Sequence, residues 1–141
     1  MVLSLLKSWL CTIIASFAVA KYRYYNRNPD LIRTKDCVCR AISTATGLYY
    51  DAVINLLSMS AKEFDCEELC VCCYNRLLED TLCYPRFDCE FKETVSEIAN
   101  KYPRNKVIIR IDAHLTTSIY GTILDIWDCS NELVDCYWIV N

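Results

Sequence analysis

The sequence contains no glutamine, a single histidine, two glycines and three prolines among its 141 residues. So little glycine and proline, with an apolar content of 54%, excludes a disordered chain and predicts a packed domain. The sequence has no glycine-rich loop to hold a phosphate and no internal repeat. A net charge of −3 gives no electrostatic case for binding nucleic acid. The length favours one domain.

Cysteine, in contrast, is abundant, and its count of 11 is odd. An odd count does not fit a closed disulfide framework, so we expect a reducing compartment with most thiols free. Several cysteines raise the alternative of a zinc-binding interaction protein; they are Cys66, Cys70, Cys73, Cys83 and Cys89. The Cys70-x-x-Cys73 pair falls inside a predicted helix and has no second such pair, unlike zinc knuckles on turns. We therefore interpret these cysteines as small apolar core residues and expect no metal and no other cofactor.

Residues 1–20 form an apolar N-terminal segment. Three interpretations are open: a signal peptide with an A-x-A cleavage site at residues 18–20, a membrane anchor, or an extension packed on the domain. Lys21 and Arg23 follow it directly, and positive charge on this flank favours its retention in the cytoplasm. We therefore expect membrane association through residues 1–20, with the domain of residues 21–141 on the cytoplasmic side and secretion less favoured.

A helix is predicted to begin at Cys37 and to end at Gly47, where a C′ glycine fits. Its apolar residues fall on one stripe at helical spacing; they are Val38, Ala41, Ile42 and Ala45. Thr34 or Asp36 can cap its first turn. A thiol at a helix N-terminus meets the positive end of the helix dipole, which stabilises the thiolate. Cys37 is thus placed as a nucleophile, with a buried inert thiol as the alternative, and Cys39 lies about 200° around the helix.

The apolar periodicity predicts three further helices, over residues 50–61, 65–80 and 91–102, with a loop over residues 83–89. From residue 107 the apolar period changes from that of a helix to that of a strand. Four strands are predicted, over residues 107–112, 114–120, 122–127 and 134–140. The first of them is predicted to be half-buried. Helices followed by an antiparallel sheet define an α+β fold.

The single histidine, His114, lies on the second predicted strand, and Asp125 lies on the next one. A cysteine that opens a helix, a later histidine and then an aspartate form the ordered set of a nucleophile, a base and an orienting group. His114 would take the proton of Cys37, and Asp125 would hold the imidazole, with Asp128 as the alternative orienting residue. Trp127 would shield the histidine–aspartate hydrogen bond from water, or simply pack in the core.

This order resembles that of the papain-like cysteine peptidases, and most closely that of small phage and prophage proteins of the superfamily. The matching residues are Asp36, Cys37, Arg40, Ala41, Ile42, Ala45, Thr46, Gly47, His114, Leu115, Gly121, Asp125, Trp127 and Asp128. The resemblance covers roughly residues 22–141. It implies that a helical half bearing the nucleophile packs on a C-terminal antiparallel sheet bearing the base. It also implies a thioester acyl-enzyme, formed by a cysteine peptidase or related amide hydrolase on a peptide or protein substrate.

One departure from the papain-like pattern concerns the oxyanion hole. Those enzymes place an amide side chain, usually glutamine, shortly before the nucleophile, and Asn28 or Asn26 would have to supply it here, unless both simply form turns. The backbone N–H of Cys37 would be the second donor. Arg40 is expected to pair with Asp36, because arginine is rarely buried unpaired. The missing glutamine and the short chain favour the alternative function, a catalytically inactive papain-like binding or structural module of a phage or prophage.

Overall fold

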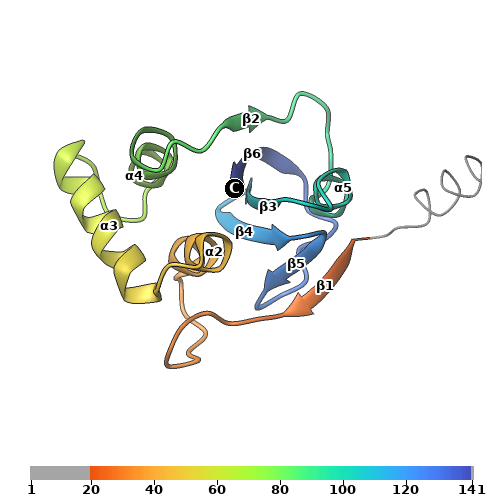
Figure 1. The fold of residues 1–141 in the computed structure, drawn as a ribbon, viewed down its shortest axis with the longest axis horizontal. Helices are drawn as coiled ribbons and strands as arrows, with labels where there is room; N and C mark the ends of the chain where they lie inside the picture. Colours follow the sequence, from red (N-terminus) through yellow and green to blue (C-terminus); the bar gives the residue numbers. More distant parts are fainter. Residues whose placement is uncertain (1–19, 141) are drawn as a thin grey trace, which may run out of the picture.

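The computed structural model describes residues 20–140 and shows an α+β fold, as predicted, built on one six-stranded sheet. Helices lie on both faces of the sheet (Figure 1). Apart from Ala20, the apolar N-terminal segment lies outside the described residues, so its predicted role stays a prediction. None of the helices within residues 20–140 combines the length and the hydrophobicity that crossing a bilayer requires.

The helix α2 (Cys37–Thr46) begins and ends where the sequence predicted. Gly47 follows it at φ 75°, a left-handed conformation that costs glycine no Cβ clash, and its N–H donates to the carbonyl of Ser43 at 3.0 Å. The predicted side-chain cap was wrong. Asp36 occupies the N-cap position but makes no capping hydrogen bond, because its carboxylate is bound by other side chains described below. The next helix, α3 (Tyr50–Glu63), ends two residues later than predicted.

The helix predicted over residues 65–80 begins later than expected. The structure has α4 (Val71–Arg76), which continues into the π-helical turn η1 (Leu77–Thr81). Leu69 adopts φ 66° and is 42% exposed, so the chain before α4 turns instead of coiling. The Cys70 sulfur then caps α4 by accepting the N–H of Cys73 at 3.3 Å. Of the predicted apolar stripe, Cys73 and Leu77 are buried, Cys66 and Cys70 pack partly buried against the same core, and only Leu69 is exposed.

The helix predicted over residues 91–102 is also shorter in the structure, as α5 (Val95–Lys101). A capping box sets its start. The Thr94 hydroxyl accepts the N–H of Glu97 at 3.2 Å, and the Glu97 carboxylate accepts the N–H of Thr94 at 2.8 Å. The loop predicted over residues 83–89 contains a short exposed strand, β2 (Arg86–Asp88), which pairs with the last strand of the sheet.

The sheet has the strand order β1-β5-β4-β3-β6-β2. Its four C-terminal strands agree with the predicted ones to within two residues; they are β3 (Lys106–Ile111), β4 (His114–Ile119), β5 (Thr122–Asp125) and β6 (Val134–Val140). The prediction of a purely antiparallel sheet was wrong, because β1 (Lys21–Tyr24) pairs in parallel with β5. This strand is short and mostly exposed, so no buried alternation marked it in the sequence. Its register places Tyr24 opposite Asp125.

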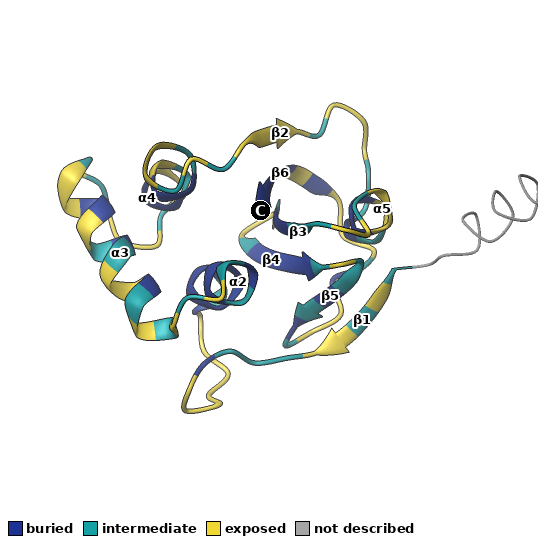
Figure 2. Cartoon of the chain, in the orientation of Figure 1, coloured by how far each residue is buried: buried dark blue, intermediate teal, exposed yellow. Residues whose placement is uncertain are grey.

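Two apolar cores lie on opposite faces of the sheet (Figure 2). On one face, Ile108 and Trp138 pack with α2, α3 and α4, and on the other face Val107 and Ile109 pack with α5. The strand β3 was predicted to be half-buried, but it is central and covered on both faces. The helix α2 lies between α3 and the sheet, so its N-terminus is held against β4.

Candidate active site

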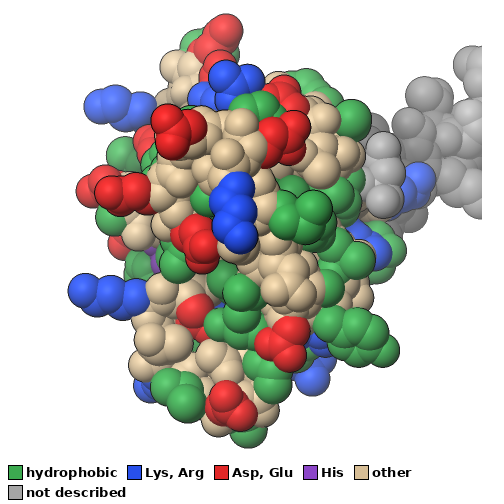
Figure 3. Space-filling view, turned by 90° about the vertical axis from the view of Figure 1, so that its left-hand side faces the viewer, with side chains coloured by type: hydrophobic (Ala, Val, Ile, Leu, Met, Phe, Trp, Pro, Cys, Tyr) green, Lys and Arg blue, Asp and Glu red, His purple; other side chains and the backbone are tan. Residues whose placement is uncertain are grey.

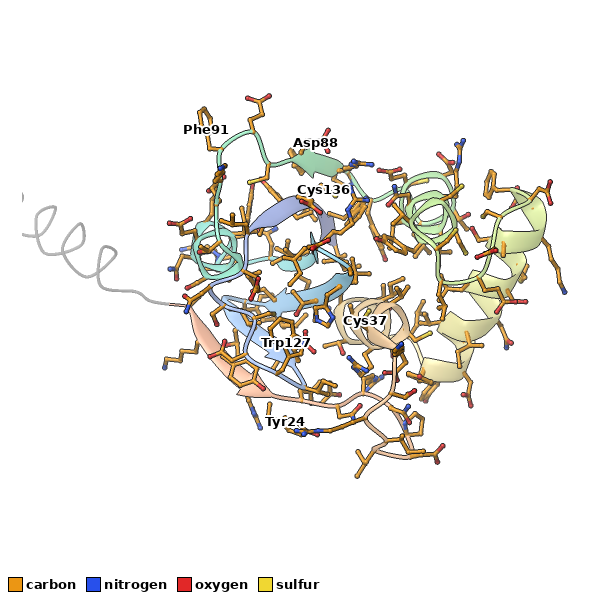
Figure 4. The ribbon with its side chains drawn as sticks, turned by 180° about the vertical axis from the view of Figure 1, so that it is seen from behind. Tyr24, Cys37, Asp88, Phe91, Trp127 and Cys136 are labelled. Carbon is orange, nitrogen blue, oxygen red and sulfur yellow. The ribbon has the colours of Figure 1, made fainter. Side chains whose placement is uncertain are left out.

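Cys37, His114 and Asp125 come together from three elements. Cys37 is the first residue of α2, His114 is the first of β4, and Asp125 is the last of β5. Since β4 and β5 are antiparallel neighbours, the start of β4 and the end of β5 lie next to each other at the same end of the strands. The Nε2 atom of His114 lies 2.7 Å from Oδ2 of Asp125. Figure 4 labels Cys37 and Trp127, which both lie in the region where α2 meets the sheet.

The orientation of the imidazole follows from its partners. Because Nε2 faces the carboxylate of Asp125, Nδ1 is the ring nitrogen that remains for Cys37, whose thiol pKa is lowered by the nearby imidazole. The carboxylate accepts a hydrogen bond from Nε2–H, which leaves the Nδ1 lone pair of a neutral ring free to accept a proton. This tautomer allows His114 to act as a base toward the Cys37 thiol.

Burial shifts the pKa of each of the three groups toward its neutral form, and the contacts among the groups shift each pKa back by more. Burial raises the pKa of Cys37, but the hydrogen bonds from His114 and from the N–H of Leu115 bring it below its ordinary value of 9.0. Burial lowers the pKa of His114, but the hydrogen bonds with Asp125 and Cys37 raise it to about 9. Burial raises the pKa of Asp125, but the hydrogen bond with His114 leaves it below 3.8. The pKa of the thiol and that of the imidazole therefore both shift in the direction that favours a thiolate–imidazolium pair.

The other buried thiols near this site are kept protonated. Burial raises the pKa of Cys39 to about 11, which agrees with its interpretation as a poorer nucleophile. Burial raises the pKa of Cys129 to about 12, and its sulfur lies 3.8 Å from Oδ2 of Asp125. Cys37 is the thiol that the site activates.

Trp127 lies against the imidazole. The two rings meet edge to face, with centroids 5.2 Å apart, and the indole Nε1 is 3.2 Å from Nε2 of His114. Since the Nε2 proton points at Asp125, the ring offers no lone pair there, and the contact with Trp127 is one of packing. The side chains of His114 and Asp125 are only 12% and 4% exposed. Trp127 thus occupies the position that a shield against water requires.

The alternative orienting residue, Asp128, is occupied elsewhere. Its Oδ1 accepts the backbone N–H of Ser130 at 3.1 Å and also the Ser130 hydroxyl. The side chain is exposed, and the carboxylate that contacts His114 is that of Asp125. The geometry selects Asp125 and not Asp128 to hold the imidazole.

The structure does not place Asn28 as the oxyanion donor that the sequence predicted. Its Nδ2 donates to Oδ2 of Asp36 at 3.0 Å, and its Oδ1 accepts the N–H of Asp30 at 2.9 Å. Asn28 is 7% exposed and lines a different hollow from the one beside Cys37. The amide of Asn26 donates to the carbonyl of Ile32. Both amides therefore have structural roles, Asn28 by holding Asp36 and Asn26 by holding the loop.

The environment of Asp36 explains why the N-terminus of α2 carries no side-chain cap. Its carboxylate accepts the Tyr50 hydroxyl at 2.6 Å, accepts the amide of Asn28, and pairs with Arg40. With the carboxylate so bound, Asp36 makes no capping hydrogen bond to the first helical turn, and the N–H of Cys37 has no side-chain acceptor. Free N–H groups beside a nucleophile can receive a developing oxyanion.

Arg40 joins the nucleophile helix to the orienting carboxylate. Its guanidinium pairs with Asp36, as predicted, and its second terminal nitrogen lies 3.9 Å from Oδ1 of Asp125. The side chains of Arg40 and Asp36 are 7% and 9% exposed. No local pattern in the sequence could predict the contact with Asp125, because the two residues lie so far apart in the chain.

The substitution Arg40→Met is expected to lower the free energy of unfolding by about 3–5 kcal/mol, because it leaves a buried Asp36 carboxylate without its cation. Urea denaturation followed by circular dichroism measures this loss. The matched control is Arg76→Met, which removes an exposed pair with Asp80 at the same helical spacing and should cost less than about 1 kcal/mol. Equal losses in the two variants would contradict a buried, structurally required pair.

A groove of about 600 Å³ opens beside Cys37 and His114. One wall comes from the start of α2 and from the start of α4 with the turn before it: Val38, Leu69, Cys70, Val71 and Tyr74. Its other wall comes from the sheet, mainly from the β3–β4 hairpin: Arg110, Ile111, Asp112, Ala113, Leu115 and Asp135. The turn of that hairpin is strained, since Ala113 adopts φ 52° directly before His114. The volume falls in the range of ligand pockets, so a short stretch of substrate can lie across Cys37.

Within residues 20–140, one group of three metal-ligating side chains comes together, and it consists of His114, Asp125 and Cys129. The cysteines that raised a zinc site in the sequence form no such group in that part of the chain. Two ligands bound tetrahedrally at about 2.0 Å from zinc would lie about 3.3 Å apart. The 2.7 Å between Nε2 and Oδ2 is instead a hydrogen-bond distance. The contact between His114 and Asp125 is therefore a hydrogen bond and not the spacing of two zinc ligands.

Comparison of the chain with family models, with curated proteins and with solved structures found no match. What defines the chain is therefore its fold and its site. The fold is α+β, and the site is a cysteine–histidine–aspartate set beside a groove.

Proposed function

We propose that this protein is a papain-like cysteine peptidase or a related amide hydrolase that acts through a thioester acyl-enzyme. The observation that carries this proposal is the 2.7 Å contact between His114 and Asp125 beside a cysteine that opens a helix. His114 also lowers the pKa of the Cys37 thiol, as a base paired with a nucleophile would. Each residue has a partner that suits its role as nucleophile, base or orienting group.

In the first step the Cys37 sulfur attacks the carbonyl carbon of the substrate, and the imidazole carries the thiol proton. Collapse of the tetrahedral intermediate breaks the C–N bond, and His114 gives that proton to the leaving amine. Water then attacks the thioester carbonyl while His114 takes a proton from the water. The C–S bond breaks, which releases the acid product and regenerates the Cys37 thiolate. Asp125 stays ionised throughout and keeps the imidazole oriented.

The free N–H groups at the start of α2, including that of Cys37, are the donors that we assign to the oxyanion. The substrate is a peptide or protein segment lying in the groove, with its carbonyl over Cys37. Deamidation or acyl transfer would use the same residues, because these reactions differ only in the leaving group or in the attacking nucleophile.

One observation favours a second candidate, an inactive papain-like binding module. The residues that line the groove include no asparagine and no glutamine, so no side-chain amide stands ready to bind the oxyanion. A site with backbone donors alone stabilises the intermediate less, and loss of one donor typically costs a hundredfold or more in rate. On this alternative the groove binds a peptide without cleaving it.

The test uses an activated acyl donor, which does not require knowledge of the natural substrate. Protein is mixed with 4-nitrophenyl acetate at pH 7, and acetyl groups are located by peptide mass spectrometry. We expect acetylation first at Cys37, release of nitrophenolate beyond one equivalent, and loss of both in Cys37→Ala. Cys39→Ala is the control and should keep both.

Acetyl groups spread over the exposed thiols Cys72 and Cys83, with Cys37 no more reactive than they are, would refute the catalytic proposal. Acylation of Cys37 without turnover would mean that the thiol is activated but that water does not hydrolyse the acyl-enzyme efficiently.

A further inference from the structure

Residues 21–35 carry a concentration of positive charge that contrasts with the rest of the chain. They include one acidic residue, Asp30, and five basic ones: Lys21, Arg23, Arg27, Arg33 and Lys35. The net charge of the whole chain is nevertheless −3. Arg27 is partly buried and donates to the Ser43 hydroxyl at 3.0 Å, so it serves the fold. The other four are exposed, and we call Lys21, Arg23, Arg33 and Lys35 the basic edge.

The basic edge occupies one border of the molecule. The strand β1 is the last strand of the sheet on its side, and from it the chain runs along that border to α2 (Figure 1). The two parts of the edge touch, since the Arg33 guanidinium lies 5.3 Å from the centre of the Tyr24 ring. The amide of Asn26 also binds the carbonyl of Ile32, which folds the loop back toward β1. Arg33 therefore lies close to the end of β1 in space as well as in sequence.

Large apolar side chains stand exposed among these cations. Tyr24 is 50% exposed, Leu31 71%, Ile32 56% and Tyr49 82%. Leu31 and Tyr49 line one shallow hollow, of about 360 Å³, which joins the loop to the start of α3. Isolated exposed apolar residues are ordinary, but four within one border form a surface that water solvates poorly.

Anionic lipid is the partner that this combination fits. Exposed cations bind the headgroups, while aliphatic and tyrosine side chains enter the boundary between headgroups and acyl chains. Nucleic acid would also attract the cations and stack on the tyrosines, but it would gain nothing from Leu31 and Ile32. In the sequence, the apolar residues 1–20 directly precede β1. On the face bearing α3 and α4, in contrast, charges of both signs are interspersed (Figure 3).

We infer that the basic edge, with its exposed apolar residues, docks the folded domain on an anionic membrane surface. The residues that line the groove beside Cys37 and those that line the hollow at the border have no member in common. Docking through the border therefore leaves the groove open to substrate. This inference does not depend on whether Cys37 is catalytic.

The test compares binding of the full chain to vesicles of pure phosphatidylcholine and to vesicles with 30% phosphatidylglycerol, by co-sedimentation. Any contribution of residues 1–20 to neutral lipid is common to all variants, so the readout is the ratio of the two affinities. We expect the wild type to favour the anionic vesicles. Changing the four cations to serine should reduce that ratio by up to about 600-fold, since each basic residue near the surface contributes about fivefold.

The matched control changes four exposed cations on other surfaces to serine: Lys62, Arg76, Lys92 and Lys101. This variant has the same net charge as the test variant and should keep the wild-type ratio. A second pair of variants measures how much the exposed apolar side chains contribute to binding. Leu31→Ser with Ile32→Ser should weaken binding to both vesicles, whereas Met59→Ser with Phe91→Ser, equally exposed elsewhere, should not.

Three outcomes would overturn the inference. The wild type could show no preference for anionic lipid, in which case the cations only guard the open strand edge against pairing with other chains. The test and control variants could lose affinity equally, which would mean that net charge and not this border governs binding. Alternatively, the protein could bind single-stranded RNA through the basic edge and ignore the vesicles. Circular dichroism confirms that each variant is folded before it is scored.

Discussion

Replacing Asp125 with asparagine is expected to slow the acylation of Cys37 by 4-nitrophenyl acetate at pH 7 on the order of a thousandfold. The amide keeps the size of the carboxylate but loses the charge that helps to raise the pKa of His114 to about 9. It can also present an N–H to Nε2, which would place the imidazole proton on Nδ1, toward the thiol. Both changes remove the base that Cys37 needs. Stopped-flow release of nitrophenolate gives the rate.

The matched control for Asp125 lies three residues away. Asp128→Asn changes the same functional group on an exposed side chain whose contacts are with Ser130 and not with His114. Its acylation rate should stay within about twofold of the wild type. If Asp128→Asn were the slower variant, the imidazole would be held by Asp128 in solution, and the assignment of Asp125 would be wrong.

The second large effect concerns the pH dependence of alkylation at Cys37. The pKa of this thiol lies below 9.0, so its thiolate, and its rate with iodoacetamide, should fall only when the pH drops through that lowered value. In His114→Ala the hydrogen bond and the positive charge are gone, while burial remains and raises the pKa. The midpoint should therefore move to higher pH. Near pH 6.5 the variant should react at least tenfold more slowly than the wild type.

Peptide mass spectrometry after timed alkylation reads each cysteine separately, and Cys83 provides an exposed internal reference. For amide hydrolysis the profile should also fall above about pH 9, because His114 then lacks the proton that the leaving amine requires. An unshifted midpoint in His114→Ala would mean that the imidazole does not stabilise the thiolate.

The sequence predicted those parts of the structure that local patterns determine. The span of α2 follows from its apolar stripe and from Gly47, and β6 and the start of β4 follow from strand periodicity. The triad residues were expected because the chain has a single histidine and the order of the three is distinctive. Their proximity could be anticipated once His114 and Asp125 were placed on neighbouring antiparallel strands.

Contacts between distant segments could not be predicted in the same way. The strand β1 forms only because β5 lies beside it, about a hundred residues along the chain, and its own residues show no buried alternation. Asn28 lies near the nucleophile in sequence, yet tertiary contacts with Asp36 and Tyr50 direct its amide elsewhere. Tyr50 itself carried no signal beyond the start of a helix. Polar networks of this kind depend on the final packing of several elements.

The parallel pairing of β1 with β5 has a mechanical consequence. Its register runs from Lys21 opposite Thr122 to Tyr24 opposite Asp125, and the N–H of Tyr25 bonds the Asp125 carbonyl at 2.9 Å. If the domain is tethered at its N-terminal end, a pull on the tether first loads the rungs at Lys21. The rung beside Asp125 is the last to part. Force applied at the attachment point therefore breaks the hydrogen bonds at the start of β1 before it reaches the residues that position the imidazole. A tethered domain under load would keep the arrangement of Cys37, His114 and Asp125.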